Sequence, residues 1–294
     1  MIYPLAHKAY RHLKRIVSTC ETVDFGKFKL TIDPRDPGGL AYHQKHYFGD
    51  LLCPLENEIV ARFRPSVYLD VGANYGFTAL AHAARNPGCL IIAVEPSPTL
   101  LPYLKQNLEA AGCNFRLVDA VCSDRPGRMP FSLNLAGSQD NRVFEDHQST
   151  PARAWKTVAA AATTVTELLQ SVAVDAFAYI KVDTQGFEER VFQGADAFLR
   201  SHNRWLVRTE FAPKWLASQG TDPLMHLKNL VERYVVAELP KRTRFRGDSL
   251  STVLDDALDP EHCQAFVQYL RGLADGDGWC DLLVVPPTSP LLRH

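Results

Sequence analysis

An acidic residue and two glycines follow an apolar run at residues 67–71 and could form a ligand-binding turn. Asp70, Gly72 and Gly76 give the pattern acid-x-Gly-x-x-x-Gly, and residues 77–85 then have the periodicity of a helix. Glycines permit a tight turn and let the backbone approach a ligand closely. An acid at a strand end suits a cationic amino group rather than a pyrophosphate, which favours the methionine part of S-adenosylmethionine over a dinucleotide. A plain glycine-rich turn also fits, so this motif alone leaves the alternatives open.

Two further acids stand at the ends of the next apolar runs. Glu95 follows the run at 90–94, where a carboxylate can accept hydrogen bonds from both ribose hydroxyls of a nucleotide. A solvated surface glutamate is the alternative, but an apolar run that delivers Glu95 to the sheet edge favours ribose binding. Asp119 lies near the end of the run at 115–121. It could accept from an adenine amino group or act as a cap or turn residue, and both interpretations are equally supported.

A charged pair, Lys181 and Asp183, lies at the end of the apolar run at 177–182. Charges at the end of a buried strand are costly unless they are paired or used. The pair could simply be an ion pair that supports the following loop. Because ligands of open α/β sheets bind at the carboxyl ends of the parallel strands, a functional role is favoured.

Short apolar runs alternate with helical patterns from residue 66 onward. This alternation predicts βαβ units and a mostly parallel sheet that is buried on both faces. The expected strands are 67–71, 90–94, 115–121, 129–133, 177–182, 205–211, 235–239 and 281–285. The expected helices are 77–85, 99–111, 165–172, 188–201, 223–234 and 260–274. Residues 134–162 are less regular, and a variable loop or lid is expected there.

Residues 1–65 precede the first parallel strand and are interpreted as an N-terminal extension that could serve as a substrate lid, with residues 66–294 as the main domain. The extension has helical periodicity and basic residues at 1–19, and a candidate edge strand at 28–32. The first segment lacks a continuous apolar core and a clear cleavage site, so a signal peptide is not expected. We expect it to form a short amphipathic helix that packs on the domain, and contact with a membrane surface is the alternative.

The bulk composition argues against several classes of protein. The 294 residues include 32 Lys and Arg against 33 Asp and Glu, so the basic surplus typical of a nucleic-acid-binding protein is missing. Seven cysteines are scattered without a C-x-x-C pair, which favours reduced thiols in the cytoplasm over a disulfide framework or a structural zinc site. No apolar run is long enough to cross a bilayer.

Six segments together resemble the FkbM family of methyltransferases. They are YLDVGANYGFTAL (68–80), AVEPSP (93–98), RLVDAVCSD (116–124), TTVTELL (163–169), YIKVDTQGFEERVFQGA (179–195) and VRTEF (207–211). The resemblance implies an α/β, Rossmann-like class I methyltransferase fold, with a seven-stranded, mostly parallel sheet, helices on both faces and an antiparallel last strand. It also implies S-adenosyl-L-methionine as methyl donor, and a hydroxyl acceptor on a sugar, glycan or small natural product.

The resemblance also assigns roles to individual residues of this chain. It implies cofactor contacts for Asp70, Gly72, Asn74, Gly76, Glu95, Asp119 and Ala120, and an acidic position upstream of the first strand for Glu56. It places an acid after the fourth strand at Asp183 and another at the end of the fifth strand at Glu210. Gln185 departs from the family, where many relatives have Glu, and this argues against a metal-binding or base role there.

Methyl transfer to a hydroxyl benefits from a general base, because an alcohol is a poor nucleophile until its proton is drawn off. Asp183 and Glu210 are the candidate bases, and Lys181 could orient the acceptor or pair with Asp183. His43 and His46, in a loop before the core, are weaker candidates. No metal ligand is assigned.

The acceptor is expected to be a small molecule or a glycan, not a nucleic acid. A basic cluster at 241–246 follows the strand expected at 235–239 and could hold a phosphate or carboxylate of the acceptor, although a solvated charge run is at least as well supported. Two other functions stay open. One is a non-catalytic module that binds S-adenosylmethionine, and the other is an NAD-dependent oxidoreductase, which the missing G-x-G-x-x-G pattern disfavours.

Overall fold

The computed structural model describes residues 20–44, 55–143, 155–239, 249–276, 278–289 and 292. The helix expected at 1–19, His46 and the basic cluster at 241–246 lie outside these residues. Those three expectations stay predictions.

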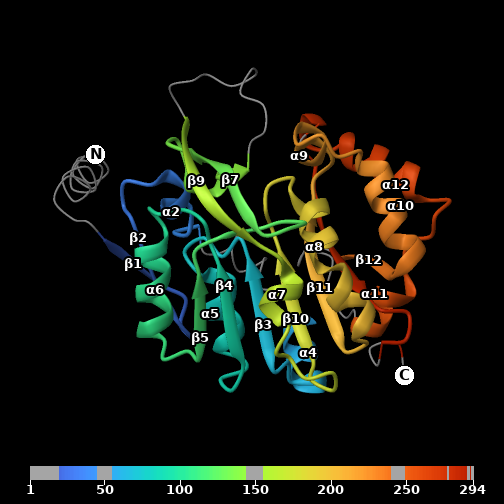
Figure 1. Cartoon of the computed structure of the whole chain (residues 1–294), viewed down its shortest axis with the longest axis horizontal. Helices are drawn as coiled ribbons and strands as arrows, with labels where there is room; N and C mark the ends of the chain where they lie inside the picture. Colours follow the sequence, from blue (N-terminus) through green and yellow to red (C-terminus); the bar gives the residue numbers. More distant parts are fainter. Residues whose placement is uncertain are drawn as a thin grey trace, which may run out of the picture.

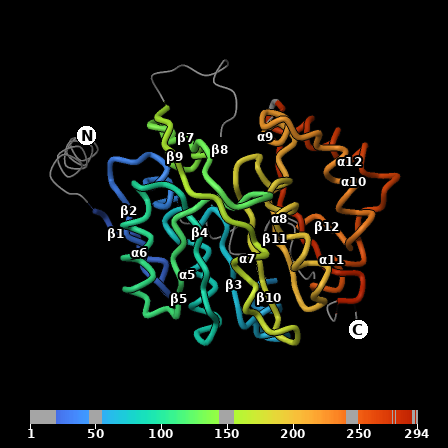
Figure 2. The backbone as a smooth tube through the Cα atoms, viewed as in Figure 1, coloured from blue at the N-terminus to red at the C-terminus, as the bar shows by residue number. Residues whose placement is uncertain are grey.

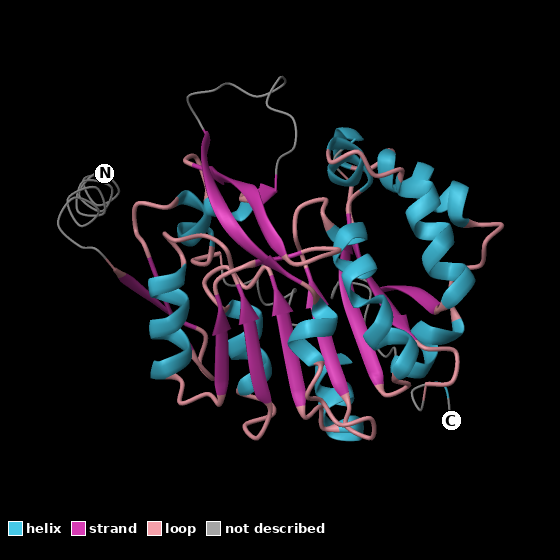
Figure 3. Cartoon of the chain, viewed as in Figure 1, coloured by secondary structure: helices cyan, strands magenta, loops and turns pink. Residues whose placement is uncertain are grey.

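A seven-stranded sheet forms the centre of the molecule (Figures 1 and 3), in the order β12-β13-β11-β10-β3-β4-β5. Its strands are β3 (Val67–Val71), β4 (Leu90–Val94), β5 (Phe115–Val118), β10 (Ala178–Val182), β11 (Trp205–Phe211), β12 (Val235–Leu239) and β13 (Cys280–Val285). The strands from β5 to β11 are parallel, whereas β13 runs antiparallel to both of its neighbours, β11 and β12. The α/β fold with a seven-stranded, mostly parallel sheet and an antiparallel last strand is thus confirmed.

Helices cover both faces of this sheet (Figure 2), which explains why its strands are apolar along their length. One face packs against α4 (Leu55–Phe63), α5 (Phe77–Ala83), α6 (Leu101–Ala110) and α11 (Leu250–Asp255). The other packs against α7 (Val165–Leu169), α8 (Glu188–Ser201), α9 (Pro213–Ser218), α10 (Pro223–Arg233) and α12 (Cys263–Arg271). None of the described helices combines the length and the apolar character needed to cross a membrane.

A second sheet of four strands lies across the carboxyl ends of the parallel strands (Figure 3), in the order β6-β9-β7-β8. β7 (Gly127–Asn134) and β9 (Trp155–Thr163) pair antiparallel along their whole lengths, and β8 (Arg142–Val143) extends the sheet beyond β7. The prediction of a loop over 134–162 is therefore wrong for the residues of β9. Its run of alanines shows no alternating pattern, and the strand is fixed by backbone pairing to a partner distant in sequence.

The strand expected at 115–121 is two strands. β5 ends the central sheet, whereas β6 (Val121–Cys122) pairs in parallel with β9 in the second sheet. The break falls at Asp119 and Ala120. The chain passes from one sheet to the other at this point, so the acid within the expected strand marks its break.

The strand expected at 28–32 does form, but it is not an edge strand of the central sheet. β2 (Lys29–Ile32) pairs with β1 (Glu21–Asp24) in a two-stranded sheet of its own. The amide of Asn107 on α6 accepts a hydrogen bond from the N–H of Thr31 (2.7 Å) and donates one to its C=O (2.9 Å). These bonds fix β2 on a helix rather than on a neighbouring strand. A short helix, α2 (Pro37–Ala41), follows.

His82 on α5 is a buried histidine whose ring nitrogens have no hydrogen-bond partner among the described residues. Its ring stacks on Tyr68, with centroids 4.3 Å apart, and meets Tyr179 edge-on. Burial and, secondarily, the nearby Arg85 lower the pKa of His82 to about 3. The imidazole is therefore neutral in the folded protein and acts as an aromatic core side chain.

The lowered pKa of His82 predicts that acid destabilises the fold. Between pH 6.5 and about 3 the unfolded chain binds a proton at His82 that the folded chain does not bind. The free energy of unfolding then falls with falling pH by up to about 1.4 kcal/mol per pH unit. In His82→Phe, we expect this free energy to fall less between pH 7 and pH 5. Urea unfolding at both pH values measures the difference, and an identical pH dependence in the two proteins would contradict this account.

Candidate active site

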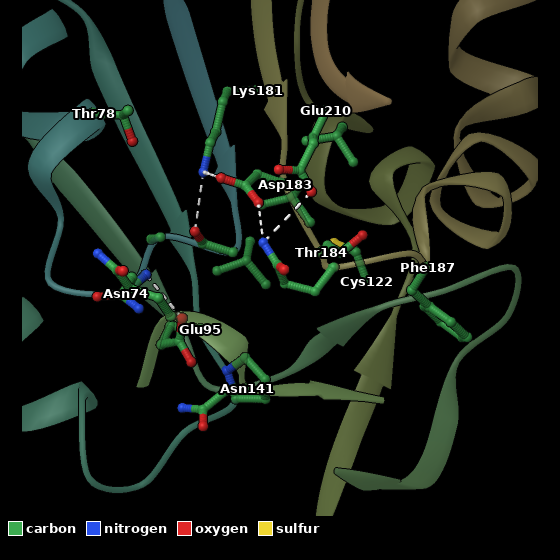
Figure 4. A pocket seen from close by; sticks show the side chains of 18 of the residues that line it. Asn74, Thr78, Glu95, Cys122, Asn141, Lys181, Asp183, Thr184, Phe187 and Glu210 are labelled. Atoms are coloured by element: carbon green, nitrogen blue, oxygen red, sulfur yellow. Dashed lines mark hydrogen bonds and ion pairs between the residues drawn. The ribbon is translucent and has the colours of Figure 1, made fainter. Parts of the chain in front are cut away.

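A cavity of about 350 Å³ opens where the carboxyl ends of the parallel strands face the four-stranded sheet. One end, the donor end, is formed by residues that follow β3, β4 and β5: Gly72, Ala73, Asn74, Glu95, Pro96, Ala120 and Val121. The other end, the acceptor end, is formed by Trp279 and by residues on and after β10 and β11. The latter are Lys181, Asp183, Gln185, Phe187, Glu210 and Trp215. Figure 4 shows carboxyl and amide groups at both ends.

The turn after β3 places Gly72, Ala73 and Asn74 in the cavity lining. Gly72 has a φ of +78°, and a Cβ there would lie 2.0 Å from the carbonyl oxygen of Asp183. The N–H groups of Gly72 and Ala73 both donate to the C=O of Val94, at 3.0 Å. Gly76, with a φ of +88°, begins α5. The glycine at position 72 is therefore required by the close approach of two loops.

Glu95 is a buried carboxyl group that faces the donor end. It accepts hydrogen bonds from the N–H of Asn74 (2.8 Å) and of Ser97 (2.9 Å), one on each oxygen. Burial raises the pKa of Glu95 to about 7, although these two N–H groups and Lys181 oppose the rise. Each oxygen keeps one lone pair, so the group can accept further hydrogen bonds from hydroxyl groups.

A buried lysine joins the loops that follow β3 and β10. The ammonium of Lys181 lies 3.3 Å from a carboxylate oxygen of Asp70 and 3.3 Å from one of Asp183, and donates to the C=O of Gly72 at 3.1 Å. Burial lowers the pKa of Lys181, but Asp183 and Asp70 outweigh it and the net shift is upward. Asp70 also accepts from the hydroxyl of Thr78 at 2.6 Å. The lysine is therefore charged and held in one place.

Asp183, Gln185 and Glu210 meet at the acceptor end (Figure 4). The Gln185 amide donates to Asp183 at 3.2 Å and to Glu210 at 3.5 Å. Burial and the neighbouring carboxylates, Asp183 above all, raise the pKa of Glu210 well above its ordinary value, against the opposing effect of Lys181. This shift favours the protonated form of Glu210, in which the carboxyl group can donate a hydrogen bond.

A second buried ion cluster lies one strand further along the sheet. Arg208 on β11 is the direct neighbour of Lys181 in the strand register. Its guanidinium contacts Glu56 at 3.1 Å and Asp281 at 3.0 and 2.5 Å. The hydroxyl of Tyr179 also donates to Glu56, at 3.2 Å. Glu56 therefore supports Arg208 from α4 and does not line the cavity.

The predicted site residues fall into two groups. Gly72, Asn74, Glu95, Ala120, Lys181, Asp183 and Glu210 line the cavity, whereas Asp70, Gly76, Glu56 and Asp119 do not. Asp70 is fully buried beneath it, and Asp119 is exposed to solvent. His43 is exposed and lies 3.4 Å from Glu21, outside the cavity lining.

Sequence reasoning missed other residues that line the cavity. Ser138 to Asn141 come from η1 (Ser138–Asp140) and the residue after it, between β7 and β8, in the region expected to be a variable loop. Trp215, on the unpredicted α9, and Arg208, inside an apolar strand, were also missed. An arginine within the apolar run at 205–211 was a usable signal for Arg208, but nothing local marks Trp215 or the segment 138–141.

Acidic side chains at the acceptor end do not form a metal centre in the described part of the chain. No group of three or more His, Cys, Asp or Glu side chains there is arranged to hold a metal ion. The carboxyl groups of Asp183 and Glu210 are instead bridged by the Gln185 amide.

Comparison with known families identifies the chain. The sequence model described as the methyltransferase FkbM domain matches residues 70–234, which is more than half of the 294 residues. The chain belongs to the FkbM family of methyltransferases. The resemblance predicted from the sequence is confirmed. The match includes the turn after β3, Glu95, and the Lys181, Asp183 and Glu210 positions.

Three crystal structures show remote likeness to this FkbM protein. The methyltransferase FkbM from Methylobacillus flagellatus KT is 10% identical, with a TM-score of 0.47, and the match covers 80% of this chain and 47% of that one. This chain thus spans about half of its length. M. jannaschii TYW2, in complex with AdoMet, is 12% identical, with a TM-score of 0.41, and the match covers 91% of this chain and 85% of that one. The plantazolicin methyltransferase BamL, in complex with a triazolic desmethylPZN analog and SAH, is 9% identical, with a TM-score of 0.44. This match covers 84% of this chain and 88% of that one.

All three TM-scores are below 0.5, so the family assignment does not rest on these likenesses. No curated protein matches the chain in sequence. The assignment therefore depends on the family match and on the strand order of the central sheet.

The donor end of the cavity fits S-adenosylmethionine, the methyl donor of this FkbM methyltransferase. The turn after β3 places the backbone of Gly72 in the cavity lining. The buried carboxyl of Glu95 has lone pairs available for hydroxyl groups. A nucleoside with two hydroxyls and an amino-acid tail needs both features.

The contact between Gly72 and Asp183 predicts a selective effect of an added methyl group. Gly72→Ala forces the two loops apart, and we expect its affinity for S-adenosylhomocysteine to fall at least tenfold. Gly220→Ala is the matched control, because Gly220 has a φ of +80° but nothing lies within 4 Å of an added Cβ. Both variants carry similar backbone strain, of about 1–2 kcal/mol. Calorimetric titration measures the affinities, and equal values for the two variants would contradict the argument.

Proposed function

We propose that this FkbM methyltransferase methylates a hydroxyl group on a sugar, a glycan or a small natural product. The observation that carries the proposal is the environment of Asp183. Its carboxylate lies 3.3 Å from the Lys181 ammonium, its side chain is 40% exposed, and it lines the acceptor end of the cavity. A carboxylate in this position can take the proton of a hydroxyl whose oxygen is the methyl acceptor.

The donor is proposed to bind at the Gly72 and Glu95 end of the cavity. S-adenosylmethionine supplies a methyl group on a positively charged sulfur, which is already activated for transfer. In this proposal Glu95 accepts the ribose hydroxyls, the backbone of Gly72 and Asn74 lies against the methionine part, and Ala120 lies at the adenine side. Asp70 acts indirectly, because its buried carboxylate is already occupied by Lys181 and Thr78.

The two acids at the acceptor end are proposed to have different roles. Asp183 is the base, because its carboxylate lines the cavity and lies 3.3 Å from the Lys181 ammonium. Burial and Asp183 raise the pKa of Glu210 well above its ordinary value, which favours its protonated form. It can therefore donate a hydrogen bond that orients the acceptor. The two carboxyl groups share the Gln185 amide, which fixes the distance between them.

Aromatic side chains support the assignment of the acceptor. Phe187, Trp215 and Trp279 line the same cavity as the two carboxyl groups. Flat apolar surfaces beside hydrogen-bonding groups suit a compound that presents hydroxyls on an apolar ring. Lys181 and Arg208, basic side chains of the lining, are both engaged with carboxylates. A neutral hydroxyl compound fits these surroundings.

Binding and transfer assays together test the proposal. We expect calorimetry to show micromolar binding of S-adenosylhomocysteine and none of NAD. In Asp183→Asn, the affinity for S-adenosylhomocysteine is expected to stay within threefold. Transfer of a radiolabelled methyl group to a panel of hydroxyl compounds is expected to fall by about a hundredfold or more, because the base is lost.

Asp175→Asn is the control for this assay, because Asp175 is an exposed acid just before β10, at the end of the strand away from the cavity. It should leave both binding and transfer unchanged. Preference for NAD, or absence of binding to S-adenosylhomocysteine, would overturn the donor assignment. Full transfer by Asp183→Asn would overturn the role of Asp183 alone.

A further inference from the structure

Asp36, in the segment before the central sheet, accepts five hydrogen bonds. Its Oδ1 accepts from the N–H groups of Gly38 and Ser138, both at 3.0 Å. Its Oδ2 accepts from the N–H of Gly39 (3.0 Å), the hydroxyl of Tyr75 (2.8 Å) and the hydroxyl of Ser138 (2.5 Å). Capping the short helix α2 requires only the Gly38 and Gly39 bonds. The other three bonds reach two distant parts of the chain.

Those three bonds connect the N-terminal segment to the two sides of the donor end. Tyr75 belongs to the turn between β3 and α5, and Ser138 begins η1, which follows β7 of the second sheet. Ser138 also accepts a hydrogen bond from the side-chain amide of Asn74, at 3.4 Å. The turn after β3, the N-terminal segment and η1 therefore meet at one carboxylate.

Residues 138–141 form a wall of the donor end. All four line the cavity that Glu95 and Asn74 line, and Figure 4 labels Asn141 near Glu95. The side chain of Asn141 accepts from the N–H of Asn134 at 2.8 Å, which closes this segment onto β7. On its other side the wall is held by Asp36.

Close packing shows that the wall and the N-terminal segment are fitted to each other. A Cβ at Gly38 would lie 2.8 Å from the hydroxyl oxygen of Ser138 and 2.9 Å from its backbone nitrogen. Both distances are shorter than real Cβ contacts, and one involves backbone, so a side chain at this position would displace the wall. The structure thus provides a second way to disturb the wall without changing Asp36.

We infer that Asp36 is a positioning residue of the donor site, which holds residues 138–141 in place as its wall without touching the donor. The inference rests on the proposed binding of the donor at the Glu95 end. A wall fixed by a carboxylate slows the escape of a bound molecule, whereas a loosened wall leaves the Glu95 end open. Asp36 should therefore affect the dissociation rate of the donor more than the stability of the fold.

The test compares two variants with a control that has the same local role elsewhere. Asp222 also caps a helix, α10, accepts hydrogen bonds from two backbone N–H groups and precedes a proline, but it lies outside the donor cavity. Asp36→Asn weakens the cap and the wall contacts, Gly38→Ala displaces only the wall, and Asp222→Asn weakens only a cap. Stopped-flow displacement of S-adenosylhomocysteine and thermal unfolding are measured for all three.

We expect dissociation to be at least tenfold faster in Asp36→Asn and at least threefold faster in Gly38→Ala. For Asp222→Asn the dissociation rate should stay within twofold of that of the unsubstituted protein. Its loss of thermal stability should be similar to that of Asp36→Asn. Rates within twofold for both Asp36→Asn and Gly38→Ala would overturn the inference, as would an equal effect of Asp222→Asn. If Asp36→Asn does not fold, the rate in Gly38→Ala decides. An unsubstituted protein that binds no S-adenosylhomocysteine would overturn the proposed function, and this inference with it.

Discussion

A lysine ammonium buried between two carboxylates is the interaction on which the site depends. Lys181 lies opposite Asp70 in the register of β10 and β3, and both side chains are almost completely buried. A buried charge is tolerated only when it is paired and hydrogen-bonded, and removing one partner leaves the other charge uncompensated. Asp70, Asp183 and the C=O of Gly72 together meet this requirement for Lys181. The cluster therefore fixes two loops in one arrangement.

The same charged row extends across the sheet and explains why the cavity has two chemically different ends. Arg208 is the neighbour of Lys181 in the register of β10 and β11, and it is neutralised by Glu56 and Asp281. Lys181 and Arg208 therefore hold the neighbouring carboxylates in place. Burial raises the pKa of the Glu95 and Glu210 carboxyl groups, which both line the cavity. One end then offers acceptors to hydroxyl groups, and the other brings the Asp183 and Glu210 carboxyl groups together through the Gln185 amide.

Much of the fold could be predicted from the sequence because buried parallel strands have a simple pattern. Strands β3, β4, β11 and β12 and helix α8 have the predicted bounds, since apolar runs and helical periodicity directly reflect burial. The alanine-rich β9 and the transfer of β6 to the second sheet could not be predicted. They are decided by pairing between segments distant in sequence, for which neither segment carries a local pattern.

The site was only partly predictable, for a related reason. Position at a strand end predicted that Glu95 and Asp183 face the cavity, because parallel strands end at one edge of a sheet. The same reasoning placed Asp70 at the ligand, but its side chain points beneath the turn, toward Lys181. Strand position does not decide which way a side chain turns. The wall at residues 138–141 depends on a contact with Asp36 that is 102 positions away in the sequence.

The affinity of Lys181→Met for S-adenosylhomocysteine tests most directly whether the site depends on the buried Lys181 ammonium. Methionine keeps an apolar stem of similar length but carries no charge. Removing one partner of a buried ion pair costs about 3–5 kcal/mol of stability. The double variant with Asp70→Asn should therefore recover stability, because no buried carboxylate is left unpaired at that position. Affinity should fall at least tenfold in both variants, since Gly72 and Asp183 have lost their shared donor. Affinity within twofold of the unsubstituted protein, in either folded variant, would contradict the account.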